Sequence, residues 1–106
     1  MERVTVGRVN KALPPSLPIR IDRQSVLGNP FVLGRDGDRA TVIAKYHVYI
    51  YQALKTDSDV QTEFLRLCEL LQAGHSLNLQ CWCAPRACHG DHIKDILDDC
   101  LRFISP

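Results

Sequence analysis

Residues 77–92 read LNLQCWCAPRACHGDH, and this run predicts a strand that turns sharply into a helix. Leu77, Leu79 and Cys81 alternate with polar residues, which is the period of a strand with one buried face. A tight loop around Pro85 follows, and apolar residues at helical spacing come after it. We therefore expect Cys81 to be buried and structural, because it continues the apolar face of this strand.

Apolar residues recur at helical spacing in two earlier segments as well. The first segment follows Asp38, a residue type that is favoured as an N-cap. The second begins at Ser58, which with Gln61 has the spacing of a capping box, and Gly74 is a natural stop for this helix. With the segment after Cys88, the sequence predicts three helices.

Two short β-prone runs precede the helices, at residues 4–9 and 19–22, and a proline-rich connector separates them. The expected order of elements is β-β-α-α-β-α. This order favours a small α/β domain over residues 1–106, with a short, mostly parallel sheet and flanking helices.

The composition is that of one soluble globular domain. The chain has 106 residues, of which 45% are hydrophobic and 24% charged. Its net charge of +1 argues against an extended nucleic-acid surface, which usually carries a clear basic excess. No run reaches the roughly 18 apolar residues of a membrane helix, and the start lacks the apolar region of a signal peptide. We therefore expect a cytoplasmic protein that does not enter a membrane.

Five cysteines are present, and in a reducing compartment they are expected to be free thiols, metal ligands or catalytic groups. Three of them lie in the strand-to-helix run. Ligands of open α/β sheets bind at this kind of junction, beyond the carboxyl ends of strands. The five residues are Cys68, Cys81, Cys83, Cys88 and Cys100.

Cys88 is a candidate nucleophile, because a helix start and the nearby Arg86 and His89 favour a thiolate and lower the pKa of a thiol. His89 and Asp91 are candidate acid/base groups. The simpler alternative is that Cys88 or Asp91 only caps the helix and that His89 lies on the surface.

A zinc site is a second interpretation of the same run. Cys81, Cys83 and Cys88, with either His89 or His92, would supply four ligands. The spacing is C-x-C-x4-C-H rather than the usual C-x2-C, and no second pair of ligands follows.

A second group of polar residues lies in two turns, residues 28–31 (GNPF) and 34–39 (GRDGDR). Arg39, at a helix start beside unpaired backbone N–H groups, is suited to clamp a phosphate or a carboxylate. The physical pattern alone favours two turns and a capped helix, with Arg39 in solvent or bonded to Asp36.

Together the two groups resemble the domain-of-unknown-function family 4326, small bacterial and phage proteins. The resemblance extends over about residues 4 to 102, and its C-terminal motif is the most specific part. It implies a compact α/β domain in which both groups belong to one site, but it supplies no reaction. The matching residues are Gly28, Asn29, Pro30, Phe31, Gly34, Asp36, Gly37, Arg39, Tyr46, Cys81, Trp82, Cys83, Pro85, Cys88, His89, Gly90 and Asp91.

We therefore expect a cytoplasmic domain that binds or acts on a small anionic, nucleotide-like ligand, with Arg39 and the Cys88 corner within reach of that ligand. Cofactor, reaction and oligomeric state are left open. The alternative is a non-catalytic, zinc-stabilised interaction module such as a phage accessory protein. The expected catalytic residues are Cys88, His89 and Asp91, and the expected ligand-binding residues are Asn29, Arg39, Cys83, Arg86 and Gly90.

Overall fold

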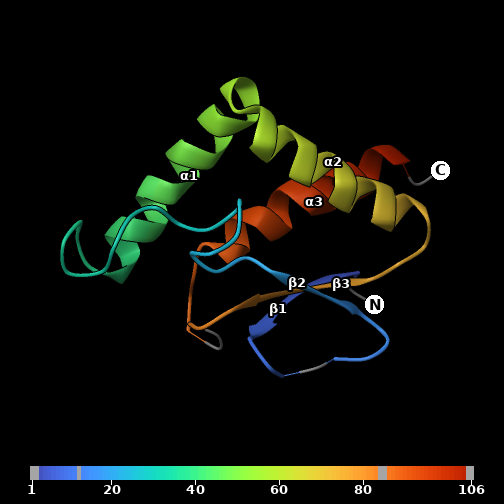
Figure 1. Cartoon of the computed structure of the whole chain (residues 1–106), viewed down its shortest axis with the longest axis horizontal. Helices are drawn as coiled ribbons and strands as arrows, with labels where there is room; N and C mark the ends of the chain where they lie inside the picture. Colours follow the sequence, from blue (N-terminus) through green and yellow to red (C-terminus); the bar gives the residue numbers. More distant parts are fainter. Residues whose placement is uncertain (1–2, 12, 84–85, 105–106) are drawn as a thin grey trace.

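A computed structural model describes residues 3–11, 13–83 and 86–104 of the chain. Strands and helices follow one another in the predicted order (Figure 1). The fold class predicted from the sequence, a small α/β domain, is confirmed. The elements are β1 (Val4–Arg8), β2 (Leu17–Arg20), α1 (Arg39–Thr56), α2 (Ser58–Gln72), β3 (Leu77–Cys81) and α3 (Gly90–Ile104).

The sheet has the order β1-β3-β2, and β3 is parallel to both of its neighbours. Leu77 is in register with Val4 of β1 and with Leu17 of β2. The ladder continues one step past the strands, where the Val9 N–H donates to the Cys81 carbonyl oxygen at 3.0 Å. Parallel pairing places the carboxyl ends of all three strands at one edge of the sheet.

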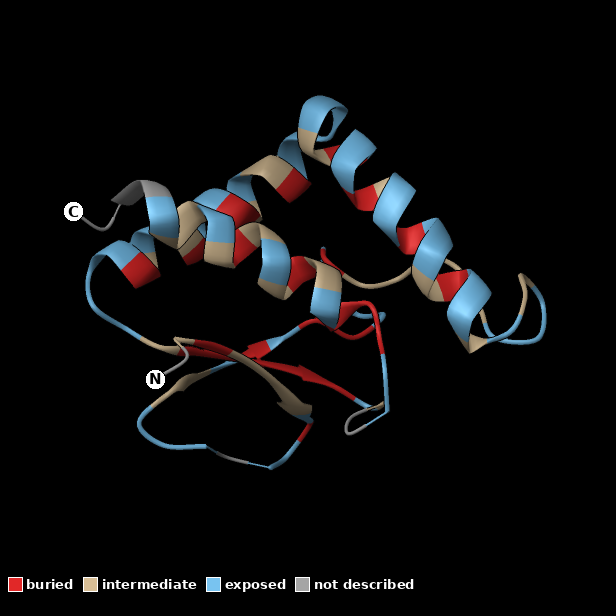
Figure 2. Cartoon of the chain, turned by 180° about the vertical axis from the view of Figure 1, so that it is seen from behind, coloured by how far each residue is buried: buried red, intermediate tan, exposed pale blue. Residues whose placement is uncertain are grey.

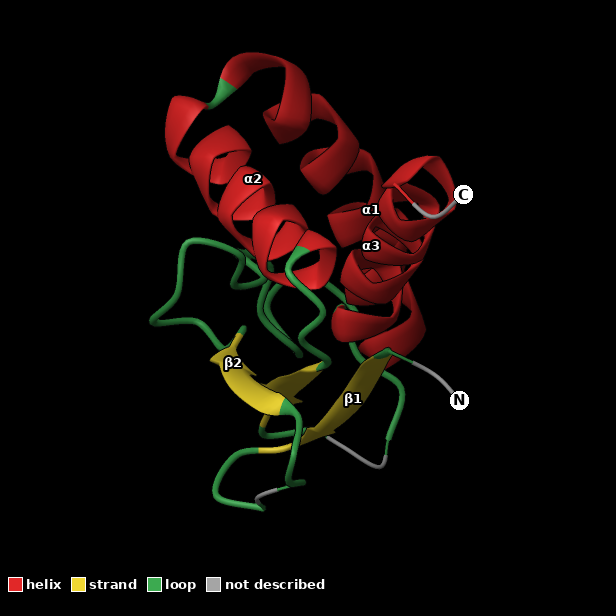
Figure 3. Ribbon diagram, turned by 90° about the vertical axis from the view of Figure 1, so that its right-hand side faces the viewer, coloured by secondary structure: helices red, strands yellow, loops and turns green. Residues whose placement is uncertain are grey.

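The three helices lie on one side of the sheet (Figures 1 and 3). Helix α3 packs on β1 and β3, α2 packs on α3, and α1 packs on α2. Buried residues follow one stripe of each helix and the whole of the central strand (Figure 2). Within the described residues, no helix is long and apolar enough to cross a membrane.

Every residue of β3 is buried, including two amide side chains on the face away from the leucines. These amides bond to each other and to β1: Gln80 Nε2 donates to Asn78 Oδ1 at 3.1 Å, and Asn78 Nδ2 donates to Thr5 Oγ1 at 3.0 Å. Gly7 leaves the room for this network, because a Cβ there would lie 2.9 Å from Asn78 Nδ2. The network satisfies polar groups that would otherwise be costly to bury.

The predicted N-cap of α1 is confirmed, and that of α2 is one residue off. Asp38 accepts from the Thr41 N–H at 2.9 Å. Helix α2 is capped by Asp57 rather than Ser58, because the Asp57 carboxylate accepts from the N–H groups of residues 59 and 60. Gln61 does not close a capping box; its Nε2 donates to the Leu54 carbonyl oxygen at 2.9 Å.

Two hydrogen bonds hold the middle of the loop between β2 and α1 to that helix. The Asn29 amide accepts from the Phe31 N–H at 2.9 Å and donates to the Val42 carbonyl oxygen at 3.3 Å. The buried Tyr46 hydroxyl donates to the Leu27 carbonyl oxygen at 2.7 Å. These bonds hold the loop against α1 while its first residues stay next to the sheet edge.

Gly28→Ala tests how tightly this loop is packed. A Cβ at Gly28 would lie 2.5 Å from the Asp22 carbonyl oxygen and 2.8 Å from the Arg23 Cα, and backbone atoms cannot move away cheaply. We predict a loss of about 2–3 kcal/mol in the free energy of unfolding, measured by urea denaturation. The control Val26→Ala, on an exposed side chain of the same loop, should stay within about 0.5 kcal/mol of wild type. Equal stabilities of both variants would contradict the packing described here.

Candidate functional site

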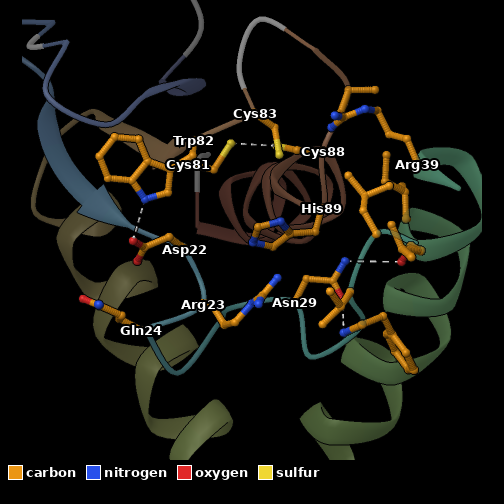
Figure 4. Close-up of a pocket in the computed structure, with 16 residues that line it drawn as sticks. Asp22, Arg23, Gln24, Asn29, Arg39, Cys81, Trp82, Cys83, Cys88 and His89 are labelled. Atoms are coloured by element: carbon orange, nitrogen blue, oxygen red, sulfur yellow. Dashed lines mark hydrogen bonds between the residues drawn. The ribbon is translucent and has the colours of Figure 1, made fainter. Parts of the chain in front are cut away.

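A cavity of about 380 Å³ lies where β2 and β3 end, at the carboxyl edge of the sheet. Its wall comes from the segment after β2, the turn between Asn29 and Leu33, the first turns of α1, and the loop from the end of β3 to the start of α3 (Figure 4). The two groups of polar residues that the sequence singles out therefore meet in one place.

Arg39 joins the two groups directly. Its Nη1 donates to the Ala87 carbonyl oxygen at 3.3 Å across 48 residues of sequence, and Arg39 and Cys88 line the same cavity. Arg39 and Cys88 therefore lie at one cavity, which is the arrangement that a shared ligand requires. Fewer backbone N–H groups are unpaired at the start of α1 than the sequence predicted, because the Thr41 N–H already donates to the Asp38 carboxylate.

Cys88 is 3% exposed, and its sulfur lies 3.0 Å from the Cys81 sulfur. The hydrogen bond with Cys81, followed by burial, raises the pKa of the Cys88 thiol above its ordinary value. The predicted lowering of this pKa is therefore wrong. Helix α3 begins only at Gly90, whose N–H donates to the Cys88 sulfur at 3.3 Å, and this one bond does not outweigh the effect of Cys81 and burial.

His89 is buried rather than on the surface. Its Nε2 lies 2.6 Å from the Ile21 carbonyl oxygen. A carbonyl only accepts, so Nε2 carries a proton and donates. Burial lowers the pKa of His89, although the bond to Ile21 and the carboxylates of Asp22 and Asp91 oppose this effect. The ring is therefore neutral at pH 7, and Nδ1 holds a lone pair.

Nδ1 is the ring nitrogen of His89 that takes no part in the bond to Ile21. Among the described residues, the buried side-chain polar atoms left without a partner are Arg3 Nε and Ser25 Oγ, and Nδ1 of His89 is not one of them. Because His89 lines the cavity, we expect Nδ1 to accept a hydrogen bond from a molecule that binds there.

The sequence analysis missed a further polar cluster at the edge of the cavity, formed by Arg20, Asp22 and Trp82. The buried Asp22 carboxylate accepts from Trp82 Nε1 at 3.1 Å and from the Arg20 guanidinium. Arg20 is the largest cause of the lowered pKa of Asp22, and its guanidinium also lies 5.7 Å from the centre of the Trp82 ring. The signal available in the sequence was the position of Asp22, directly after the carboxyl end of a strand.

The other predicted site residues occupy three kinds of position. Asn29 and Cys83 line the cavity, although the Asn29 amide is engaged in its own turn. Arg86 and Asp91 are exposed and lie outside the cavity lining. Gly90 is the first residue of α3. A Cβ there would lie 2.8 Å from Ile21 Cδ1, so glycine allows the start of the helix to pack closely against Ile21.

The zinc interpretation finds no support in the described part of the chain. That part contains no group of three or more His, Cys, Asp or Glu side chains placed to hold a metal ion. Of the expected ligands, His89 donates to Ile21, and the His92 ring faces His47 on α1 at 4.6 Å between ring centres.

The fold and the cavity define a small α/β domain with its candidate site at the carboxyl edge of a parallel sheet. The chain belongs to the family described as "Domain of unknown function (DUF4326)", which matches residues 4–99 and confirms the resemblance seen in the sequence. No curated protein and no solved structure matches the chain.

The buried His89 predicts a pH-dependent stability. The free energy of unfolding should fall as the pH is lowered through 6.5, the ordinary pKa of an imidazole, because the unfolded chain then binds a proton that folded His89 does not. His92, whose pKa is lowered by burial and by His47, acts in the same direction.

We predict that His89→Gln makes this fall smaller, measured by urea denaturation between pH 7.5 and 5.5, while the exposed control His75→Gln leaves it unchanged. A His89→Gln variant with the full wild-type pH dependence would show that His89 is not buried as a neutral ring.

Proposed function

We propose that the cavity binds a small anionic ligand that carries a planar ring, of the size and kind of a nucleotide. The observation that carries the proposal is the position of Arg39 at the wall of the cavity. Arg39 uses one N–H group on Ala87, and a guanidinium has five. The remaining donors suit a phosphate or a carboxylate, which arginine binds in a two-pronged geometry.

The charges around the cavity favour an anion. Arg23 is a second cation of the lining, and in Figure 4 its side chain points toward the middle of the labelled residues. The one carboxylate of the lining, Asp22, is already paired with Arg20 outside it. An incoming anion therefore meets two arginines and a carboxylate whose charge is balanced.

The remaining wall suits a planar ring. Trp82 is 52% exposed, and the bond from its Nε1 to Asp22 fixes the orientation of the indole. Phe31, Val32 and Leu33 supply an apolar surface to the same cavity. Its volume lies within the range of about 300–1,000 Å³ that is usual for small-molecule sites.

His89 is the residue best placed to recognise a hydrogen-bond donor of the ligand or to take a proton from it. In the neutral ring, Nδ1 is the atom that accepts. The catalytic roles expected for Cys88 and Asp91 receive less support, because Cys88 keeps its proton and Asp91 lies outside the lining. We place the protein in the cytoplasm, a compartment consistent with its five free thiols.

The test uses Trp82, the only tryptophan of the chain, as a fluorescent reporter. We predict a saturable change in its emission on titration with adenosine monophosphate and a weaker response to inorganic phosphate, which lacks the ring. Arg39→Ala should weaken binding of the nucleotide about 10- to 100-fold, the value of one charged hydrogen-bonded contact.

The matched control is Arg66→Ala on α2, an arginine paired with Glu63 and outside the lining. It should bind the nucleotide as wild type does. The proposal is wrong if wild type and Arg39→Ala bind equally, or if neither adenosine monophosphate nor phosphate changes the emission at millimolar concentration.

A further inference from the structure

The same cavity holds a pair of thiols in contact, and their chemistry does not depend on which ligand the cavity binds. We propose that Cys81 and Cys88 form an oxidisable dithiol, which hydrogen peroxide converts into a disulfide within the chain.

The two sulfurs are already placed for a bond. They lie 3.0 Å apart, and a disulfide is about 2.05 Å long, so a movement of roughly 1 Å closes it. Each thiol is held by its surroundings: Cys81 ends the central strand and its carbonyl accepts from Val9, while the Cys88 sulfur accepts from the N–H of Gly90. The two thiols therefore lie at the two ends of the loop between β3 and α3, the loop that carries Trp82.

The contact also assigns different roles to the two thiols. The hydrogen bond with Cys81 is the chief cause that raises the pKa of Cys88, so Cys88 holds its proton more tightly than a free thiol does. In such a coupled pair one proton leaves more easily and the second less easily. We therefore assign the first attack to the Cys81 sulfur and the closing of the bond to Cys88.

Only a small oxidant reaches this pair. Cys81 is 2% exposed, and both sulfur-bearing residues line the cavity, so the cavity is the way in. Hydrogen peroxide is small enough to enter. Cys83, which lines the cavity and is less buried, is the neighbour that a non-specific oxidant would also modify.

The reaction balances with peroxide as the oxidant. The Cys81 thiolate attacks one peroxide oxygen, the O–O bond breaks, and hydroxide leaves, which gives a sulfenic acid on Cys81. The Cys88 sulfur then attacks the Cys81 sulfur, the S–O bond breaks, and a second hydroxide leaves. The two thiol protons convert the hydroxides to water. The sulfurs together lose two electrons, and peroxide is reduced to two waters.

A second thiol pair has to be removed before the test. Cys68 on α2 and Cys100 on α3 also form a hydrogen bond; burial, followed by this bond, raises the pKa of Cys68 to about 12. Both residues lie outside the cavity lining. The test therefore uses the Cys68→Ala/Cys100→Ala protein, whose fold is checked by circular dichroism.

This protein is treated with hydrogen peroxide, free thiols are blocked by alkylation, and the chain is digested. Trypsin cuts after Arg86 and separates Cys88 from the other two thiols, and chymotrypsin cuts after Trp82, between Cys81 and Cys83. We predict a cross-link between Cys81 and Cys88, with the loss of two hydrogen atoms by mass spectrometry and full reversal by dithiothreitol.

Two variants in this background sharpen the result. Cys83→Ser should still form the Cys81–Cys88 cross-link, because the Cys83 thiol takes no part in that bond. Cys88→Ser removes the closing thiol, so Cys81 should stop at the sulfenic acid and be trapped by dimedone, a reagent specific for that group.

Three results would overturn the proposal. One is a cross-link that runs through Cys83. Another is oxidation of Cys83 under conditions that leave Cys81 and Cys88 reduced. The third is the same yield of the Cys81–Cys88 cross-link in native and in urea-unfolded protein. That result would show that the position of the two sulfurs in the fold does not favour the disulfide.

Discussion

The central strand β3 is hydrogen-bonded to a parallel strand on each side, and this constraint places the rest of the molecule. The chain can leave β2 and β3 only at their shared carboxyl edge. The segment that follows β2 and the loop that follows β3 therefore run side by side, and the Trp82 indole reaches Asp22 across them. Helix α1 bounds the space between these two segments, and its Arg39 bonds to Ala87 of the second one. The cavity lies between the two segments and α1.

Burial at that edge decides the chemistry of the residues it collects. His89 is held as a neutral ring with one fixed proton, because its Nε2 meets a backbone carbonyl and its surroundings disfavour charge. Cys88 keeps its proton because its hydrogen bond with Cys81 and its burial raise the pKa of the thiol. Asp22, by contrast, stays ionised because Arg20 and Trp82 donate to it. The cavity thus offers cations, an acceptor and a protonated thiol within one small volume.

Local patterns predicted the parts of the structure that depend on near neighbours. The Asp38 cap, the alternation that ends in Cys81, and the order of the elements are all confirmed. The raised pKa of Cys88 was not predicted, because its main cause is the Cys81 thiol, which only the folded turn between β3 and α3 brings to within 3.0 Å of the Cys88 sulfur. Asp22 was missed for a similar reason, since its partner Trp82 lies 60 residues away in sequence.

The central claim is that the two groups of polar residues form one ligand site, and nuclear magnetic resonance of the labelled protein tests it most directly. Titration with adenosine monophosphate should shift the Arg39 side-chain Nε–H, the Trp82 indole N–H and the His89 Nδ1 resonance along curves that fit one dissociation constant. The Arg66 Nε–H, on α2, should stay in place. Shifts that titrate with different constants, or that leave Arg39 and His89 unchanged, would contradict a single site.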